Sequence, residues 1–348
     1  MAVTLRDVAV HAGVSVRTVS NVVNDFPQVS PHTRATVQRS IDALGYRPNR
    51  VARRLRSGRT GVVGLLIPRL AEHYFAELAD AVVTVARENE LSIVVDQTDG
   101  RRDSETSPLR QALDDGLWDG AIVSPLSMTR SDLGRHANAP LVALGEHGAT
   151  FDLAWVGTDN VAAARDATDH LISLGRSRIA VIGDQHGFGG ETGALRTRGY
   201  RAAMRAAGFR VRRDWVVAPG GYERVDGAQA MRRLLALAHP PEAVFCFNDE
   251  LAFGALHALH AAGVRVPDDI AVIGWDDLRD AQFCVPSLTS VSVDRFAVAR
   301  AAIDRLVPQF AGLDTTHDHV VIPHRIAVRA STAGDDRTDH RLTDGGTR

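Results

Sequence analysis

The sequence predicts two parts of different structural class: a small all-α headpiece containing a helix-turn-helix, and a larger two-lobed α/β body built on parallel sheets. Two observations lead to this prediction. Over about the first 46 residues, apolar side chains recur at the three- and four-residue spacing of amphipathic helices. From residue 60 onward, short apolar runs alternate with amphipathic helices, the pattern of parallel α/β units.

Three helices are expected in the headpiece. The first begins near residue 5, where Thr4 and Asp7 have the spacing of a capping box. Ser15 can cap the second helix after a glycine-containing turn. The third opens with Ser30-Pro31, a capping serine followed by proline at the first helical position, and ends at Gly45. The apolar faces of these helices form one small core.

The outward face of the second helix carries side chains suited to reading DNA bases. Arg17 can pair with guanine and Asn21 with adenine, while the methyl groups of Val16 and Thr18 can contact thymine. All four lie near the end of the helix that a recognition helix inserts into the major groove. The alternative is an ordinary three-helix bundle with no nucleic-acid partner.

The charge distribution favours the DNA-binding alternative. The chain of 348 residues has a formal charge of -2. Residues 1–59 contain ten arginines and three aspartates, a net charge of +7, so the other 289 residues carry -9. This asymmetry attracts phosphate to one end of the protein and keeps the rest away from the duplex. Every basic residue is an arginine, and the absence of lysine excludes a GxxxxGK[ST] phosphate loop and Schiff-base catalysis by this chain.

A linker with helical potential is expected at residues 47–59. After Pro48-Asn49, the apolar residues Val51, Ala52 and Leu55 line one face of a helix of about two turns and the arginines line the other. A helix this short is marginal in water, so we expect it to order only against a partner. The apolar face favours a wedge for the minor groove, and a plain basic linker is the alternative.

The body is expected to contain two successive α/β units of buried strands and amphipathic helices. The first strand, 62–67, reads as buried on both faces. Further strands are expected at 91–95, 120–123, 140–144, 178–183, 243–247 and 270–274. Helices are expected through residues 75–85, up to about 115, over about 160–174, over 196–207, over 225–237 and up to 262. A body of this length is better divided into two lobes with a ligand-binding cleft between them.

Candidate effector-binding residues follow the ends of these strands. Aromatic, carboxylate, amide and guanidinium groups together suit a small polar ring such as a sugar or a nucleobase. The residues of this type are Tyr74, Phe75, Thr192, Arg196, Tyr222, Asn248, Asp249, Trp275 and Asp276. Two of these assignments have simpler alternatives. The pair Asn248-Asp249 could only cap the next helix, and Phe75 could belong to the core.

Three other classes of protein fit the sequence less well. Glycines cluster at 187–190, but residue 192 is threonine and no dinucleotide-binding GxGxxG fingerprint forms, so we expect no enzyme and no cofactor. A secreted sugar-binding protein would need a signal peptide, and neither an apolar leader nor an 18-residue apolar span is present. We therefore expect a cytoplasmic protein without membrane contact. The histidines His257 and His260 and the distant Cys246 and Cys284 do not have the spacing of a metal site.

The chain resembles the LacI-type bacterial repressors, which include the lactose, purine and galactose repressors. The resemblance covers nearly the whole chain, to about residue 332. At the N-terminus it is carried by Val3-Thr4-Leu5-Arg6-Asp7-Val8-Ala9, Ala12-Gly13-Val14-Ser15, Thr18-Val19-Ser20, Val22-Val23-Asn24, Val29-Ser30, Thr33-Arg34, Leu44-Gly45-Tyr46, Pro48-Asn49 and Ala52-Arg53. In the body it is carried by Val266-Pro267-Asp268-Asp269-Ile270 and Pro286-Ser287-Leu288-Thr289.

The resemblance implies a homodimer, or a tetramer of dimers, that binds a pseudo-palindromic operator in double-stranded DNA and couples that binding to a small molecule in the cleft. It also implies a periplasmic-binding-protein-like body of type I. In the family, positions matching Val16, Arg17 and Asn21 read bases and the one matching Leu55 opens the minor groove. The residues expected to contact DNA are Thr4, Ser15, Val16, Arg17, Thr18, Ser20, Asn21, Asn24, Ser30, Thr33, Tyr46, Asn49, Ala52, Arg53 and Leu55. Family effector contacts fall on Phe75, Thr192, Arg196, Tyr222, Asn248 and Asp276.

Departures from the family pattern bear on the effector and on assembly. Residues 74–77 and 192–196 look like the purine-binding branch, but Gly190 stands where that branch has a ligand-contacting arginine. Because most of the family responds to sugars and Trp275 beside Asp276 suits one, we expect a sugar or sugar derivative, with a purine or nucleoside as the alternative. The polar C-terminus lacks a leucine-rich tetramerisation helix, which favours a dimer.

These inferences give the expected domain boundaries. They are a headpiece at 1–46, a linker at 47–59, an effector-binding and dimerisation domain at 60–334 and a disordered tail at 335–348. Within the effector domain, the first lobe is expected at about 60–158 and 290–319. The second lobe is expected at about 159–289 and 320–334.

Overall fold

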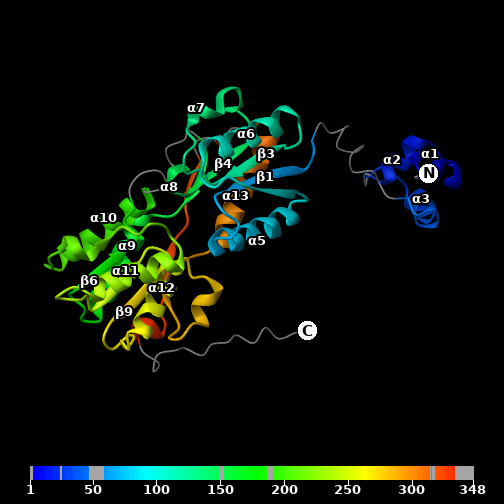
Figure 1. Cartoon of the computed structure of the whole chain (residues 1–348). Helices are drawn as coiled ribbons and strands as arrows, with labels where there is room; N and C mark the ends of the chain where they lie inside the picture. Colours follow the sequence, from blue (N-terminus) through cyan, green and yellow to red (C-terminus); the bar gives the residue numbers. More distant parts are fainter. Residues whose placement is uncertain are drawn as a thin grey trace. The chain divides into compact units, whose positions relative to one another are not determined.

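The computed structural model describes residues 3–23, 26–46, 59–148, 153–185, 191–313, 315 and 318–333. The chain forms two compact units, Met1–Gly61 and Val62–Arg348 (Figure 1). The second unit therefore begins within two residues of the predicted start of the body. The candidate DNA contacts Asn24, Asn49, Ala52, Arg53 and Leu55 lie outside the described residues, as do most of the linker and the C-terminal tail.

The headpiece has the three helices that the sequence predicts: α1 (Leu5–Ala12), α2 (Val16–Val23) and α3 (Pro31–Leu44). The capping box of α1 is formed, because the Thr4 side chain accepts from the backbone N–H of Asp7 and the Asp7 carboxylate accepts from that of Thr4. Gly45 ends α3 in the left-handed conformation, at φ 63°. The core contains Val8, Ala9, Val19, Val22, Val37 and Tyr46.

The first lobe of the body is a six-stranded parallel sheet in the order β11-β5-β4-β3-β1-β2. Its strands are β1 (Val62–Ile67), β2 (Ser92–Gln97), β3 (Gly120–Val123), β4 (Leu141–Leu144), β5 (Ala154–Gly157) and β11 (His319–Val321). Its main helices are α5 (His73–Glu88), α6 (Arg102–Asp114) and α13 (Arg295–Phe310). Val63, Leu65 and Ile67 pack in the core with α5 and α13, while Leu66 packs in the core with α6. The first strand is therefore buried on both faces, as predicted.

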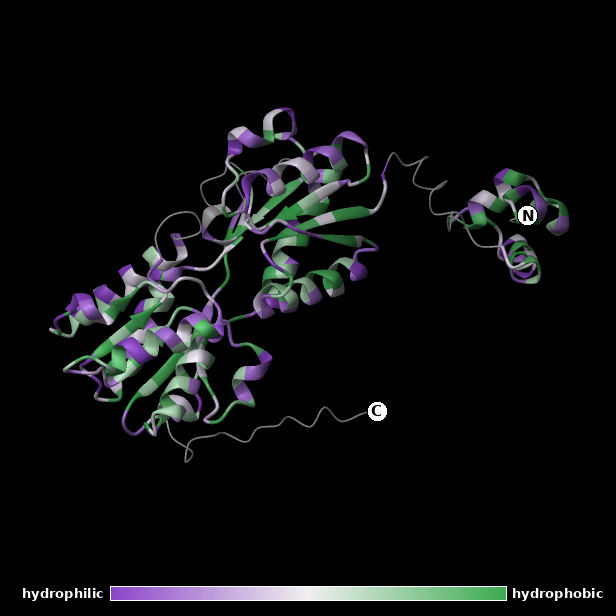
Figure 2. Cartoon of the chain, in the orientation of Figure 1, coloured by the Kyte–Doolittle hydropathy of each residue, from purple (hydrophilic) through white to green (hydrophobic). Residues whose placement is uncertain are grey.

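The second lobe has another six-stranded sheet, in the order β12-β10-β9-β8-β6-β7. Its strands are β6 (Ile179–Ile182), β7 (Val216–Val217), β8 (Ala243–Cys246), β9 (Ala271–Trp275), β10 (Thr289–Val293) and β12 (His324–Ala327). Only β12 runs antiparallel to its neighbour among these described strands. Helices α9 (Asn160–Ser173) and α10 (Glu191–Ala206) cover one face, and α11 (Arg224–Leu235) and α12 (Asp249–Ala261) cover the other. Figure 2 shows hydrophobic strands in both lobes beneath helices of mixed character.

The expected lobe boundaries need two corrections. Strand β10 belongs to the second sheet, so the chain returns to the first lobe after Val293 and not at residue 290. Strand β11 belongs to the first sheet, so the last crossing comes after Val321 and not after 319. The Thr- and Ser-rich sequence of β10 is compatible with either sheet, and hydrogen-bond pairing between strands decides its place. Among the described residues, no helix combines the length and apolar character needed to cross a bilayer.

Candidate functional site

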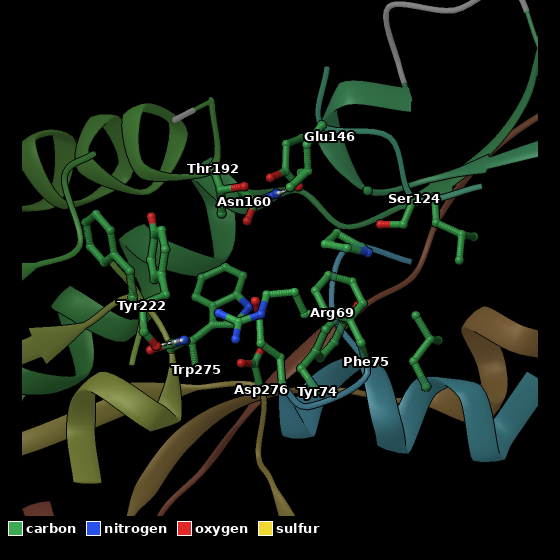
Figure 3. A pocket seen from close by; sticks show the side chains of 18 of the residues that line it. Arg69, Tyr74, Phe75, Ser124, Glu146, Asn160, Thr192, Tyr222, Trp275 and Asp276 are labelled. Atoms are coloured by element: carbon green, nitrogen blue, oxygen red, sulfur yellow. Dashed lines mark hydrogen bonds between the residues drawn. The ribbon is translucent and has the colours of Figure 1, made fainter. Parts of the chain in front are cut away.

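A cavity of about 620 Å³ lies in the body, bounded by residues from both sheets (Figure 3). This volume falls in the range of small-molecule sites. The carboxyl ends of parallel strands in both lobes open toward the cavity, because Ser124 follows β3, Gly145 follows β4 and Asp276 follows β9. The cleft that the sequence predicts at the strand ends is therefore present.

Arg196 from α10 occupies one wall of the cavity in a fixed orientation. Its Nε donates to Asn160 Oδ1 at 2.9 Å, and Nη1 donates to the carbonyl of Phe247. Its guanidinium carbon lies 3.6 Å from the centre of the Trp275 ring. Burial lowers the pKa of Arg196, whereas the nearby Asp276 and Glu146 oppose this shift. The guanidinium is thus preorganised as a donor to a polar ligand.

Trp275 is itself almost completely buried. Arg196 covers one part of its ring, and Phe245 stacks on it with ring centres 6.4 Å apart. Trp275 is 4% exposed and is one of the residues that line the cavity. Trp275 thus supports Arg196 from the cavity wall, and its contact with a sugar stays a prediction.

Asp276 lines the cavity from a strained backbone position directly after β9. Its backbone φ is 111°, a conformation that residues other than glycine rarely adopt. Burial raises the pKa of its carboxyl to about 7, although Arg196 and Arg295 both act to lower it. At neutral pH this carboxyl can therefore either accept or donate a hydrogen bond.

Tyr74 and Phe75 form the aromatic wall from the first lobe, in the first turn of α5. Their rings meet edge to face with centres 5.1 Å apart. Phe75 packs against the first-lobe core, as the alternative for this residue predicts, and it also lines the cavity. Its contact with an effector stays a prediction. Burial raises the pKa of Tyr74, and the hydroxyl stays protonated and can donate to a ligand.

Thr192, Tyr222 and Asn248 line the cavity from the second lobe. The Tyr222 hydroxyl donates to the Gly183 carbonyl at 2.8 Å, and burial raises its pKa to about 12. Asn248 caps α12, because its Oδ1 accepts from the backbone N–H of Leu251, and its Nδ2 donates to the Tyr222 carbonyl. The capping alternative for Asn248 is thus correct, and both its polar atoms already have partners in the protein.

Asp249 is the one predicted effector residue that does not line the cavity. It is 0% exposed, and its carboxylate accepts from the backbone N–H of Leu278 at 2.8 Å and from the Ser290 hydroxyl at 2.7 Å. Burial holds its pKa well above the usual value. Because Asp249 follows the capping Asn248 into α12, its side chain turns back under the loop that carries Asp276 and not toward a ligand.

The sequence reading missed several polar residues of the cavity wall. Glu146 follows β4 and lies 3.4 Å from Asn160 Nδ2, which links it to Arg196. The other missed polar residues are Arg69, Glu72, Ser124, Thr158, Asn160, Gln185, Glu223 and Asp226. The rule that ligands bind at strand ends, applied to 124 and 146, would have found two of them. Within the described ranges, no three His, Cys, Asp or Glu side chains gather as a metal site.

The headpiece presents much of its predicted DNA-contacting set on its surface. Val16 is 42% exposed at the start of α2, and Arg17 beside it is also exposed. The residues Thr4, Ser15 and Ser30 are exposed caps, while Thr18, Ser20, Asn21 and Thr33 are half-buried. Tyr46 is different, because it is 8% exposed and packs in the headpiece core. Its ring therefore supports the helices, and the contact of Tyr46 with DNA stays a prediction.

Both units of the chain match models of known protein families. Residues 4–49 match the model of "Bacterial regulatory proteins, lacI family", and residues 168–332 match that of a "Periplasmic binding protein-like domain". Catabolite control protein A of Priestia megaterium is 34% identical over 95% of this chain and 100% of its own length. The chain belongs to the lacI family. It is therefore a DNA-binding transcriptional regulator with an effector-binding domain.

Solved structures of lacI-family proteins match this lacI-family chain over almost its full length. The lac repressor dimer bound to operator and the anti-inducer ONPF has a TM-score of 0.81 at 25% identity, covering 96% of this chain and 100% of that one. The complex of the transcriptional regulator CelR with cellobiose has a TM-score of 0.70 at 32% identity, covering 94% and 99%. These matched proteins are regulators and not enzymes.

Proposed function

We propose that this lacI-family protein is a homodimeric repressor whose effector is an uncharged sugar or sugar derivative. The observation that carries the effector class is the charge of the cavity wall. Five carboxyl groups, of Glu72, Glu146, Glu223, Asp226 and Asp276, face only two guanidiniums, of Arg69 and Arg196. Acidic groups outnumber basic ones even when Asp276, with its pKa of about 7, is protonated. A sugar offers hydroxyl donors to the carboxylates and acceptors to Arg196, and it brings no negative charge into an acidic cavity.

The aromatic groups support the same ligand class. Tyr74 and Phe75 bring aromatic rings to the cavity, and Asp276 lies beside Tyr74 (Figure 3). Arg196 lines the same cavity, so a sugar ring there can meet both apolar faces and charged groups. The relative solved with cellobiose has the same fold, which agrees with a sugar in this cleft. A purine or nucleoside remains the second candidate, because Tyr74, Phe75, Thr192 and Arg196 resemble the purine-binding branch.

Thermal-shift screening with neutral sugars, acidic sugars and purines separates these candidates. A ligand at a hundred times its Kd adds about 2.7 kcal/mol of stability, which shifts the melting temperature measurably. We expect hits among neutral mono- and disaccharides. A hit with hypoxanthine or guanine alone would favour the purine alternative, and a hit with sugar acids alone would contradict the charge argument.

A substitution at Asp276 tests the site itself. In the Asp276→Ala protein, binding of the identified sugar should weaken at least tenfold in calorimetric titration, because a charged hydrogen bond is worth about 1.5–3 kcal/mol. Operator binding and the far-ultraviolet spectrum should not change. The matched control is Asp80→Ala, which removes an exposed carboxylate outside the cavity. Normal sugar affinity in Asp276→Ala would place the effector elsewhere.

We further propose how the two units communicate. Effector in the cleft favours one relative orientation of the lobes, and in a dimer this changes the spacing of the two linkers that lead to the headpieces. The cost of folding the linkers on DNA then depends on effector. A second copy can cover apolar residues at the body surface, such as Val94 and Val95 on the edge strand β2 and Phe283 and Val285 in the second lobe. Since its target is operator DNA, we place the protein in the cytoplasm.

A further inference from the structure

The loop 276–279 of the second lobe is held in a strained conformation. Asp276 and the adjacent Asp277 both have positive φ, at 111° and 53°. Consecutive non-glycine residues in this region persist only where the surrounding structure fixes them. Part of the restraint comes from the second lobe itself, since the Asp277 carboxylate accepts from Arg329 at 2.5 Å and its backbone N–H donates to the Ser290 hydroxyl at 3.0 Å.

Further restraint comes from the first lobe. Arg295, the first residue of α13, donates from Nη1 to the Asp276 carbonyl at 2.7 Å and from Nη2 to the Asp277 carbonyl at 2.9 Å. Glu77 in α5 accepts the backbone N–H of Arg279 at 3.0 Å. One guanidinium and one carboxylate of the first lobe therefore hold three backbone groups of the loop that carries the cavity residue Asp276.

Glu77 and Arg295 also hold each other. Arg295 Nε donates to Glu77 Oε2 at 2.9 Å, and Nη2 contacts the same oxygen. The side chains of this pair are only 17% and 14% exposed. Both residues belong to the first lobe, so they join the lobes only through their hydrogen bonds to the loop backbone. The ion pair of Arg279 with Asp80 joins the lobes directly, but its side chains are 72% and 61% exposed. Solvent screens an exposed ion pair far more than a shielded one, so we expect the shielded Glu77 and Arg295 to hold the loop more firmly than Arg279 and Asp80 hold each other.

The position of this pair connects the cavity to the lobe contact. The side chain of Asp276 lines the cavity, while its backbone carbonyl accepts a hydrogen bond from Arg295. A ligand that reorients this side chain therefore also displaces a peptide group that the first lobe binds. On the other side, Glu77 lies one turn along α5 from Tyr74, which lines the same cavity. Both ends of the contact therefore adjoin the ligand site.

We propose that Glu77 and Arg295 form a clamp, a pair of positioning residues through which occupancy of the cavity at Asp276 is linked to the relative orientation of the two lobes. This inference rests on the proposed function only in taking the cavity as the effector site. The clamp makes no contact with the ligand itself, and it acts through the backbone of loop 276–279.

Distance measurement between the lobes tests the clamp in the full-length protein. Spin labels are placed at Gln111→Cys on α6 and Arg205→Cys on α10, both exposed positions, in a Cys284→Ser background. Labelled protein is mixed with excess unlabelled protein, so that each dimer contains one labelled protomer. Double electron–electron resonance then reports the distance distribution without any effector. We expect Glu77→Gln and Arg295→Gln, made separately, each to add a second distance population that the unsubstituted protein lacks.

The matched control is Arg279→Gln. It removes the exposed pair with Asp80 but keeps the backbone N–H that donates to Glu77, so it should leave the distribution unchanged. If one clamp variant fails to fold, the other decides the question. Unchanged distributions in the folded clamp variants would overturn the proposal, and so would an equal change in Arg279→Gln.

A second measurement uses the sugar found by thermal-shift screening. In the clamp variants that sugar should bind within about threefold of its normal affinity, but it should no longer shift the distance distribution. A full shift in either variant would overturn the linkage. If no sugar or purine binds at all, the proposed function fails, while the effector-free distances still decide whether the clamp sets the lobe orientation.

Discussion

Asp276 shows how one side chain can combine strain, burial and charge. Its backbone occupies a conformation that costs free energy, and its carboxyl lies in a cavity that disfavours ionisation. Arg196 and Arg295 recover part of that cost without restoring the ordinary pKa. A ligand can therefore lower the free energy of this site, because its hydroxyl groups can donate hydrogen bonds to the ionised carboxyl group of Asp276.

The raised pKa of Asp276 predicts a pH-dependent stability. Between about pH 4 and about pH 7 the folded protein holds a proton that the unfolded chain has released, so the contribution of this group falls as pH rises through that window. Asp276→Asn removes the ionisation. Its melting temperature relative to the unsubstituted protein should therefore be higher at about pH 8 than at about pH 5, measured by calorimetry without ligand. A constant difference across this range would show that the pKa is ordinary.

Substitutions of Arg17 in the headpiece and Arg53 in the linker should affect DNA binding in different ways, one reducing sequence specificity and the other overall affinity. Arg17→Ala should relax discrimination at particular operator base pairs, at a cost of about 1–3 kcal/mol on the operator alone. Arg53→Ala should weaken operator and random DNA alike and reduce the slope of affinity against salt. Fluorescence anisotropy on both DNAs at several salt concentrations measures each effect. Equal losses on the two DNAs for both variants would remove the base-reading role from α2.

At the scale of elements, the second lobe depends on close packing between α11 and α12. A Cβ atom at Gly254 would lie 1.9 Å from the Arg224 carbonyl oxygen, and one at Gly227 would lie 2.1 Å from that of Leu251. Gly227 of α11 faces the backbone of α12, and Gly254 of α12 faces the backbone of α11, so the two helix backbones are in contact. This close approach fixes the positions of Tyr222 and Asn248, which flank the starts of the two helices and line the cavity.

Gly254→Ala should therefore destabilise the body even though alanine is the better helix former. The gain in helix propensity is about 1 kcal/mol, but the added methyl group meets backbone that cannot move aside, and overpacking costs about 1–3 kcal/mol or more. We expect a lower midpoint of urea unfolding. The control Gln229→Ala alters an exposed position of α11 and should have little effect. A higher midpoint for Gly254→Ala would mean that the helices separate easily.

At the scale of the whole molecule, the unequal charges of the two parts separate DNA binding from sensing. The headpiece and linker carry +7 and the remainder -9, so the phosphates of DNA attract one end of the protein and not the other. Communication between the parts is then a coupling free energy, and it must be reciprocal.

Reciprocity gives a quantitative prediction. If the sugar changes operator affinity by a given factor, about 5- to 150-fold for a coupling of about 1–3 kcal/mol, operator DNA must change sugar affinity by the same factor. Anisotropy with and without sugar gives the first factor, and calorimetry with and without operator gives the second. Two factors that differ beyond error would mean that the sugar does not act through one shared equilibrium.

Some helices and strands could be predicted from the sequence and others could not. The caps at Thr4 and Ser30 placed α1 and α3 correctly, because capping depends on residues three positions apart. The strand β1 was recognisable because it is buried on both faces and reads as a continuous apolar run. Short strands such as β5, β10 and β11 were not foreseen, since three to five residues carry too little periodicity and their sheet is chosen by distant partners.

The sequence by itself determined the residues at the ends of strands, the basic headpiece and the acidic body, because local spacing and composition express these properties directly. The tertiary structure decided which side chains face the cavity. It buried Asp249 under loop 276–279, placed Tyr46 in a core, covered Trp275 with Arg196 and joined Glu77 to Arg295. These outcomes depend on contacts between segments up to 218 residues apart in the chain, and no local pattern encodes such contacts.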